Sequence, residues 1–141
     1  MNRPTSIIWF ERLYLGSTLL WLIGAALSWQ NTRAVLAQSE SAGSLGVEAL
    51  VQLYIGVMVF ATILTLVLWY FTARARAVVA KWLVVACFAV GALLGLRGHI
   101  ATLSSDHPLE GVIGIGAMLL TAAAVFLLFR RDSVEWFSSA T

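Results

Sequence analysis

The sequence predicts an all-α fold, an integral membrane four-helix bundle that forms a single transmembrane domain over residues 1–141. Of the residues, 60% are hydrophobic and only 11% are charged, whereas a soluble domain carries about 25% charged residues. The chain therefore cannot cover itself with a polar surface. Its few charges also alternate around four long apolar stretches, because basic residues crowd some flanks and linkers while acidic residues concentrate in the others.

Four apolar stretches are long enough to cross a bilayer, which takes roughly 20 residues of helix. The first has no charge before Arg33, and the second is uninterrupted. The third has a short charge-free core, but its boundary cations Lys81 and Arg97 can extend outward to the membrane surface. The fourth ends abruptly at Arg130. The expected spans are residues 13–29, 49–71, 79–99 and 111–129.

The distribution of Lys and Arg predicts the orientation of these spans. The N-terminal flank, the linker 72–81 and the C-terminal tail hold seven of the nine basic residues, and the other linkers hold only Arg33 and Arg97. Under the positive-inside rule, both termini and the linker 72–81 face the cytoplasm. An even number of spans agrees with this orientation. The seven residues are Arg3, Arg12, Arg74, Arg76, Lys81, Arg130 and Arg131.

Small residues predict where the helices touch, because helices in lipid associate mainly by close packing. Gly91 and Gly95 form a GxxxG step, which places both glycines on one face of the third helix. The step predicts either packing within the bundle or contact with a second copy of the chain. No Asp, Glu, Lys, Arg or His lies at the centre of a span, whereas ion-coupled transporters and proton relays normally place an ionisable group there.

The densest group of polar residues lies between the third and fourth spans and is the candidate ligand-binding region. Its members are Arg97, His99, Asp106, His107 and Glu110, with Glu48 at the outer end of the second helix. Imidazole with carboxylate suits a borderline divalent metal, but no recognised ligand motif is present and we predict no metal site. The alternatives are an ion pair between Arg97 and one of the acids, or a site for a small anion or lipid headgroup.

The acids of this group also have structural roles. Glu48 and Glu110 fall in the first turns of helices that enter from the periplasm, where the positive end of the helix dipole favours a carboxylate. Pro108 suits a first helical turn, and Asp106 and His107 are its candidate caps. Neither histidine lies within an expected apolar core.

Glu11 is the candidate residue for transport, because four-helix small multidrug exporters place an essential glutamate in their first helix. Here Arg12 follows it at once, and the surrounding sequence does not otherwise resemble those exporters. We therefore expect Glu11 to be neutralised at the membrane edge by Arg12, Arg74 or Arg76.

The chain has one cysteine, Cys87, which lies in the third span. An intramolecular disulfide and a CxxC motif are therefore excluded, and Cys87 is expected to be a small buried hydrophobe. In the C-terminal tail, Asp132 has capping-box spacing to a following glutamate. Trp136 and Phe137 are expected to return to the membrane interface in a short amphipathic turn.

The opening RPTSIIWFERLYLGS, followed by a span that ends in ALSW, resembles the start of a family of small uncharacterised four-helix inner-membrane proteins of proteobacteria. The resemblance covers about the first thirty residues, beyond which only the hydropathy pattern agrees. It implies the fold and a place in the bacterial inner membrane, and it assigns no functional residue.

These observations predict a protein without catalysis of its own and without a cofactor. No nucleophile elbow, metalloprotease motif or phosphate-binding loop is present. We expect an accessory, assembly or interaction subunit of a membrane complex, in contact with the lipid bilayer and with a membrane-protein partner or a second copy, but not with nucleic acid. The alternatives are an oligomeric transporter or channel protomer and a periplasm-facing ligand or metal binder.

Overall fold

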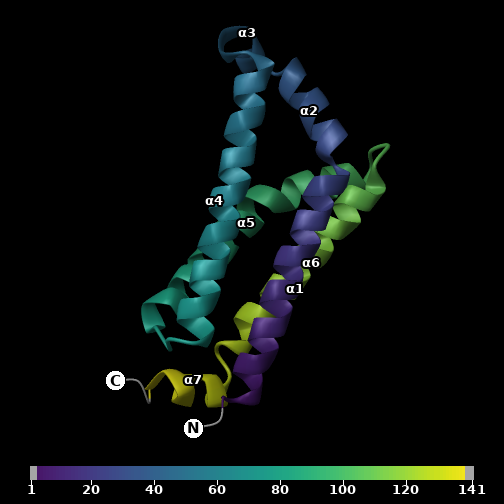
Figure 1. Ribbon diagram of the computed structural model, residues 1–141. Coiled ribbons are helices and arrows are strands. Elements are labelled where there is room, and N and C mark those ends of the chain that lie inside the picture. Colours follow the sequence, from purple (N-terminus) through teal and green to yellow (C-terminus); the bar gives the residue numbers. More distant parts are fainter. Residues whose placement is uncertain (1–2, 139–141) are drawn as a thin grey trace.

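The computed structural model describes residues 3–138, which form helices joined by short turns, with no strand (Figure 1). The helices are α1 (Thr5–Leu27), α2 (Trp29–Gln38), α3 (Glu40–Leu45), α4 (Val47–Ala73), α5 (Val78–Leu103), α6 (Pro108–Leu127) and α7 (Arg131–Ser138). The all-α prediction is confirmed.

Helices α1, α4, α5 and α6 are each long and apolar enough to cross a membrane. Their ends differ most from the predicted ones at two places. Helix α1 begins at Thr5 rather than near residue 13, because the mixed apolar and charged residues before the first span continue its helix. Helix α5 continues past residue 99 to Leu103. His99 therefore lies inside a long helix rather than at the start of a linker.

The linker between the first two long helices is itself mostly helical. Figure 1 shows α2 crossing from the end of α1 to α3, which lies at the end of α4, so that α1 and α4 diverge in this direction. Gly46 ends α3 and starts α4 with a φ of 83°. Glycine suits this position because a side chain disfavours a positive φ.

Helix α6 is central to the packing, because it lies along both α1 and α5. Glycines permit the close approach on both sides. A Cβ at Gly24 of α1 would lie 2.8 Å from Cγ2 of Ile113, and a Cβ at Gly111 of α6 would lie 2.8 Å from the carbonyl oxygen of His99. Helix α4 packs less extensively, against α1 and α5.

The GxxxG step at Gly91 and Gly95 is not one of these contacts. A Cβ at Gly91 would have no neighbouring atom within 4 Å, and one at Gly95 would meet only His99 of the same helix, at 3.4 Å. Neither glycine therefore contacts another helix in the described part of the chain. Contact with a second copy through this face stays a prediction.

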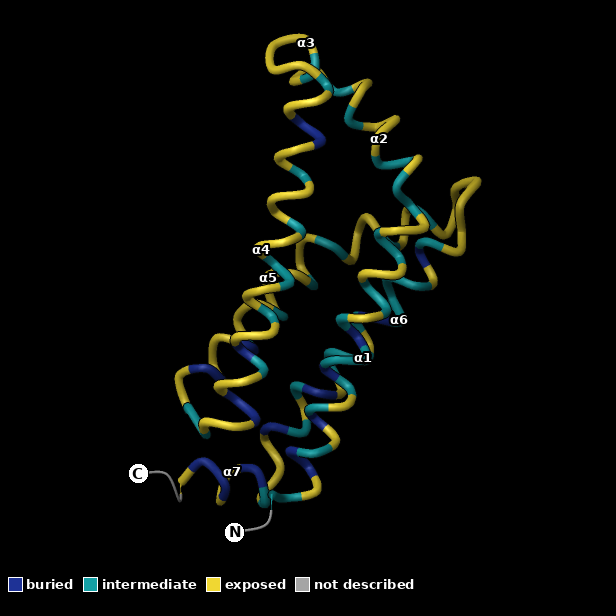
Figure 2. Tube along the Cα trace, in the orientation of Figure 1, coloured by how far each residue is buried: buried dark blue, intermediate teal, exposed yellow. Residues whose placement is uncertain are grey.

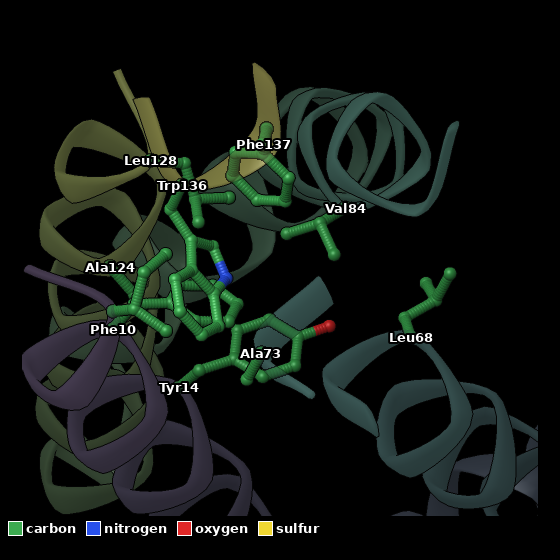
Figure 3. Close-up of a cluster of buried hydrophobic side chains, with 10 residues drawn as sticks. Phe10, Tyr14, Leu68, Ala73, Val84, Ala124, Leu128, Trp136 and Phe137 are labelled. Atoms are coloured by element: carbon green, nitrogen blue, oxygen red, sulfur yellow. The ribbon is translucent and has the colours of Figure 1, made fainter. Parts of the chain in front are cut away.

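Most of the buried residues lie at one end of the bundle (Figure 2). We call this end, where α7 and the start of α1 lie, the terminal end, and the opposite end, with α2 and α3, the loop end. Side chains from α1, α4, α5, α6 and α7 meet at the terminal end (Figure 3). The terminal-end cluster is Ile7, Phe10, Tyr14, Leu68, Ala73, Val84, Ala124, Leu128, Trp136 and Phe137.

Helix α7 closes the terminal end. The hydroxyl oxygens of Ser6 and Ser133 share a hydrogen bond of 2.6 Å, and the backbone N–H of Ser6 donates to Asp132 at 3.2 Å. Hydrogen bonding from Ser6 holds the pKa of Asp132 below its ordinary value, because it stabilises the charged carboxylate. Trp136 and Phe137 do not lie at an interface as expected, since they are only 6% and 4% exposed inside the cluster.

Cationic side chains at the terminal end lie on aromatic rings. The guanidinium carbon of Arg76 is 3.9 Å from the ring centre of Trp136, and Nζ of Lys81 is 4.3 Å from that of Phe129. Arg76 also has a φ of 55°, a left-handed conformation that is uncommon outside glycine. The turn between α4 and α5 is thus held against α7.

Candidate ligand cavity between the four long helices

A cavity of about 290 Å³ lies between α1, α4, α5 and α6, and we call it the central cavity. Aromatic, small and hydroxyl-bearing side chains form most of its wall. Among the described residues, no Asp, Glu, Lys or Arg lines it. The wall consists of Tyr14, Ser17, Thr18, Trp21, Ala61, Thr65, Val84, Cys87, Phe88, Gly91, Ala92, His99, Gly114, Ala117, Met118 and Thr121.

A second cavity, of about 160 Å³, lies nearer the loop end, and we call it the loop-end cavity. Trp21, His99 and Gly114 line both cavities, so the two adjoin. Together we call them the chamber. The other residues of the loop-end cavity are Gly24, Ala25, Ser28, Tyr54, Thr102, Glu110 and Ile113.

The terminal-end cluster closes the chamber on one side. Tyr14 and Val84 belong both to this cluster and to the wall of the central cavity. Phe10 stacks on Tyr14 with ring centres 5.2 Å apart, and its side chain is fully buried. The chamber therefore ends at this layer of large side chains and extends from it toward the loop end.

Small residues on α5 and α6 create the space of the chamber. Gly91, Gly95 and His99 recur at intervals of four residues and so share one face of α5. On α6, Gly114 lies directly against the imidazole of His99, and a Cβ at this position would overlap the ring. Gly91 therefore leaves a hollow in the surface of α5, on the same face as His99.

The hydroxyl groups of the wall already have hydrogen-bond partners, whereas the imidazole of His99 does not. Ser17 and Thr18 donate to the carbonyl oxygen of Tyr14 at 2.8 and 2.9 Å. Thr121 lies 3.0 Å from the Ser17 hydroxyl, to which it donates. Such bonds satisfy hydroxyls inside a membrane helix. No described residue forms a hydrogen bond with the His99 ring, which leaves it available to a ligand.

The polar group predicted between the third and fourth spans is dispersed. His99 lines the chamber, whereas Arg97 is exposed on another face of α5. Asp106 and His107 are exposed in the turn before α6, and Glu48 is exposed at the start of α4. Within residues 3–138, no ion pair joins Arg97 to an acid, so this expectation is wrong. The same residues include no group of three side chains placed to bind a metal.

The continuation of α5 to Leu103 explains the separation. Two residues that are two positions apart in a helix point in nearly opposite directions, since each residue turns the helix by about 100°. Arg97 and His99 therefore cannot face the same neighbour. Glu110 alone of the predicted acids stays with His99, because it follows Pro108 in the first turn of α6 and lines the loop-end cavity.

Glu11 lies at the terminal end, outside the chamber. Its carboxylate is 2.6 Å from Nη1 of Arg3 and 3.0 Å from Nη2 of Arg74. The expected pairing with Arg74 is therefore confirmed, while Arg12 lies over the ring of Trp9, 5.5 Å from its centre. A transport role for Glu11 stays a prediction.

The expectation of a buried cysteine is wrong. Cys87 is exposed and lines the central cavity. The reason lies in its helix, because the small residues that follow one turn later, Gly91 and Ala92, leave the space beside Cys87 unfilled.

Sequence reasoning missed the side chains of α1 and of its C-cap residue that line the chamber. Tyr14, Ser17, Trp21 and Ser28 are spaced by three, four and seven residues, and all four line one of the cavities. Residues at this spacing share a helix face, so the periodicity was a usable signal. Thr65 of α4 carried no comparable signal, because residues 63–68 around it include no other polar side chain.

Comparison of the chain with protein-family models, with curated proteins and with solved structures found no match. The family resemblance of the N-terminal stretch therefore stays a prediction. The inference of function depends on the chamber and on the charges at the two ends of the bundle.

Proposed function

We propose that this chain is a multi-pass protein of the bacterial inner membrane that holds a lipophilic small molecule in its chamber and has no catalysis of its own. The central cavity of about 290 Å³ carries the proposal. Ligand sites are concave and mostly apolar, with a few polar groups that orient the ligand. The chamber combines aromatic and small side chains with the imidazole of His99.

The positive-inside rule gives this proposal a direction. The terminal end carries most of the basic residues, among them Arg74 and Arg76 in the α4–α5 turn, so we assign it to the cytoplasm. Both termini are then cytoplasmic, and the loop end faces the periplasm. The chamber then extends from its closed cytoplasmic end toward the periplasm.

A chamber with one closed end suits a protein that holds a molecule more than one that conducts it. A channel or transporter protomer would need a path through the terminal-end cluster, in which Phe10 and Leu128 are fully buried. We therefore propose an accessory or interaction subunit, which delivers its ligand to a membrane partner or withholds it. A second copy of the chain is the alternative partner.

Filling the central cavity tests the proposal. Gly91→Leu adds a side chain to the wall at a position where Cβ has no neighbour within 4 Å, so the helices need not move. The matched control is Gly98→Leu, on the same helix, where Cβ is equally free and which lines neither cavity. Each protein is purified in native nanodiscs, and mass spectrometry identifies the lipophilic molecules that accompany it.

We expect the wild type and Gly98→Leu to retain the same enriched molecule and Gly91→Leu to lose it. Size-exclusion profiles confirm that all three proteins are folded. Identical bound molecules in identical amounts in all three would contradict a ligand site in the central cavity.

A further inference from the structure

The loop-end cavity contains a carboxylate that has no basic partner. Glu110 lines this cavity and is half-buried. Its contact is the side-chain amide of Asn31, whose Nδ2 donates to Oε2 at 3.4 Å, longer than a typical hydrogen bond of this kind. Within residues 3–138, no Lys, Arg or His forms an ion pair with Glu110.

Aromatic rings lie around the same cavity. Trp21 of α1 and Tyr54 of α4 both line it. Trp29 lies beside Tyr54, with ring centres 6.4 Å apart. The faces of aromatic rings attract organic cations, and the attraction strengthens where water is excluded. The loop-end cavity therefore combines two features that favour positive charge.

A helix dipole alone does not account for Glu110. A carboxylate in the first turn of a helix is favoured by the dipole, and Glu48 also lies in the first turn of its helix, α4. Glu48, however, is exposed and lines neither cavity. Glu110 is partly removed from water beside an apolar space, where a carboxylate is unfavourable unless a positive charge accompanies it.

We propose that the chamber selects lipophilic organic cations, molecules with an ammonium head and an apolar tail. The inference rests on the proposed function, because it names the class of molecule that the chamber holds. The head lies between Glu110 and the rings of Trp21 and Tyr54, and the tail extends into the central cavity. The wall on α6 from Glu110 to Thr121 is about 16 Å long at 1.5 Å per residue, which accommodates an extended alkyl chain.

The charges of the chamber disfavour the other head groups. No Lys or Arg among the described residues lines either cavity, so an anionic head would face Glu110 without compensation. A neutral head would leave the carboxylate unpaired. The expected order of affinity is therefore cation, then neutral molecule, then anion.

Three amphiphiles with the same tail and different heads test this order. Dodecyltrimethylammonium, dodecanol and dodecyl sulfate are added, below micellar concentration, to the purified full-length protein in nanodiscs of uncharged lipid. Native mass spectrometry measures how much of each is bound. We expect the wild type to bind the ammonium compound about tenfold more tightly than the alcohol, as expected for one charge-assisted contact.

Variants assign the preference to one carboxylate. Glu110→Gln preserves the shape of the side chain but removes its charge, so it should bind the ammonium compound and the alcohol equally. Glu110→Asp retains the charge and should retain the preference. Glu48→Gln removes the equivalent first-turn acid outside the chamber and should behave like the wild type.

The outcomes separate this inference from the proposed function. Equal binding of ammonium and alcohol by the wild type, or an unchanged preference in Glu110→Gln, overturns the cation inference and leaves a ligand chamber in place. If the wild type binds none of the three amphiphiles more tightly than Gly91→Leu does, both the inference and the proposed function fail.

Discussion

The two halves of the bundle consist of the same four long helices, yet one half is filled and the other is hollow. At the terminal end, the side chains of Phe10, Val84 and Leu128 are at most 1% exposed. Toward the loop end, α5 and α6 turn Gly91 and Gly114 to the interior instead. The comparison teaches that residue size at interior positions decides where the bundle closes.

The hollow half is not loosely packed throughout. Helix α6 stays close to α1 at Gly24 and close to α5 at Gly111. Helix α4 is the one that diverges from α1 (Figure 1). Three closely packed helices therefore form one wall of the chamber, and α4 provides the fourth side.

The largest expected difference between the halves is in the cost of removing a phenyl ring. Phe10→Ala should lower the free energy of unfolding by about 3–5 kcal/mol, because a fully buried ring leaves a cavity among fixed neighbours. Phe88→Ala, in the wall of the central cavity, should cost less than half as much. Unfolding in SDS-containing mixed micelles, followed by circular dichroism, measures both. Equal costs would mean that the two halves are packed alike.

The next effect concerns the glycines. Gly111→Val should destabilise the protein by about 1–3 kcal/mol, because its Cβ would lie within 3 Å of backbone atoms of α5, including the carbonyl oxygen of His99 at 2.8 Å. Gly91→Val introduces the same side chain without a neighbour within 4 Å and should leave stability nearly unchanged. The same unfolding assay compares them. A destabilised Gly91→Val would show that the GxxxG face is a packing contact.

A smaller effect is expected at the turn that contacts α7. Arg76→Ala should lower stability by about 1 kcal/mol, because the guanidinium no longer lies on Trp136. Arg76→Gly should cost less than Arg76→Ala, since glycine adopts the φ of 55° without strain. Comparison of the two variants in urea or SDS unfolding separates the ring contact from the backbone conformation. Equal losses would exclude a contribution from the backbone.

The smallest effect is expected from Asp132. Its folded-state pKa is lowered by hydrogen bonding from Ser6, so its stabilisation is complete above the ordinary aspartate pKa of 3.8 and is lost as the pH falls through the lower folded value. As the pH falls through this range, Asp132→Asn should therefore lose less stability than the wild type does. Asp106→Asn, in the exposed turn before α6, is the control. If Asp132→Asn and the wild type lose the same stability in acid, the contact of the Asp132 carboxylate with α1 does not stabilise the fold.

The all-helical fold could be predicted from the sequence because its four apolar stretches have the length and composition of membrane-spanning helices. Composition and the length of the apolar stretches are sufficient for the helices, since a backbone in lipid must satisfy its own hydrogen bonds. The position of α7 could not be predicted in the same way. Trp136 and Phe137 suit an interface by composition, and their burial depends on partners from four other helices.

The candidate site could be predicted only in part. The sequence singles out His99 and Glu110, which both line the loop-end cavity, but it groups them with Arg97 and His107, which do not. How far α5 continues decides which way each side chain faces, and helix ends are the least certain part of a sequence interpretation. A GxxxG step is equally ambiguous. If a neighbouring helix packs against the two glycines, they form a close helix contact, and if none does, they leave a cavity.

Cys87 provides the most direct test of the chamber, because it is the chain's only cysteine and lines the central cavity. A cationic, membrane-impermeant thiol reagent, 2-(trimethylammonium)ethyl methanethiosulfonate, is added to spheroplasts or to inverted membrane vesicles, and mass spectrometry of the purified protein measures modification. We predict modification from the periplasmic face, strongly slowed in Gly91→Leu and unaffected in Gly98→Leu, and none from the cytoplasmic face. Modification from the cytoplasmic face, or at the same rate in Gly91→Leu as in the wild type, would contradict a chamber that is closed at the terminal end.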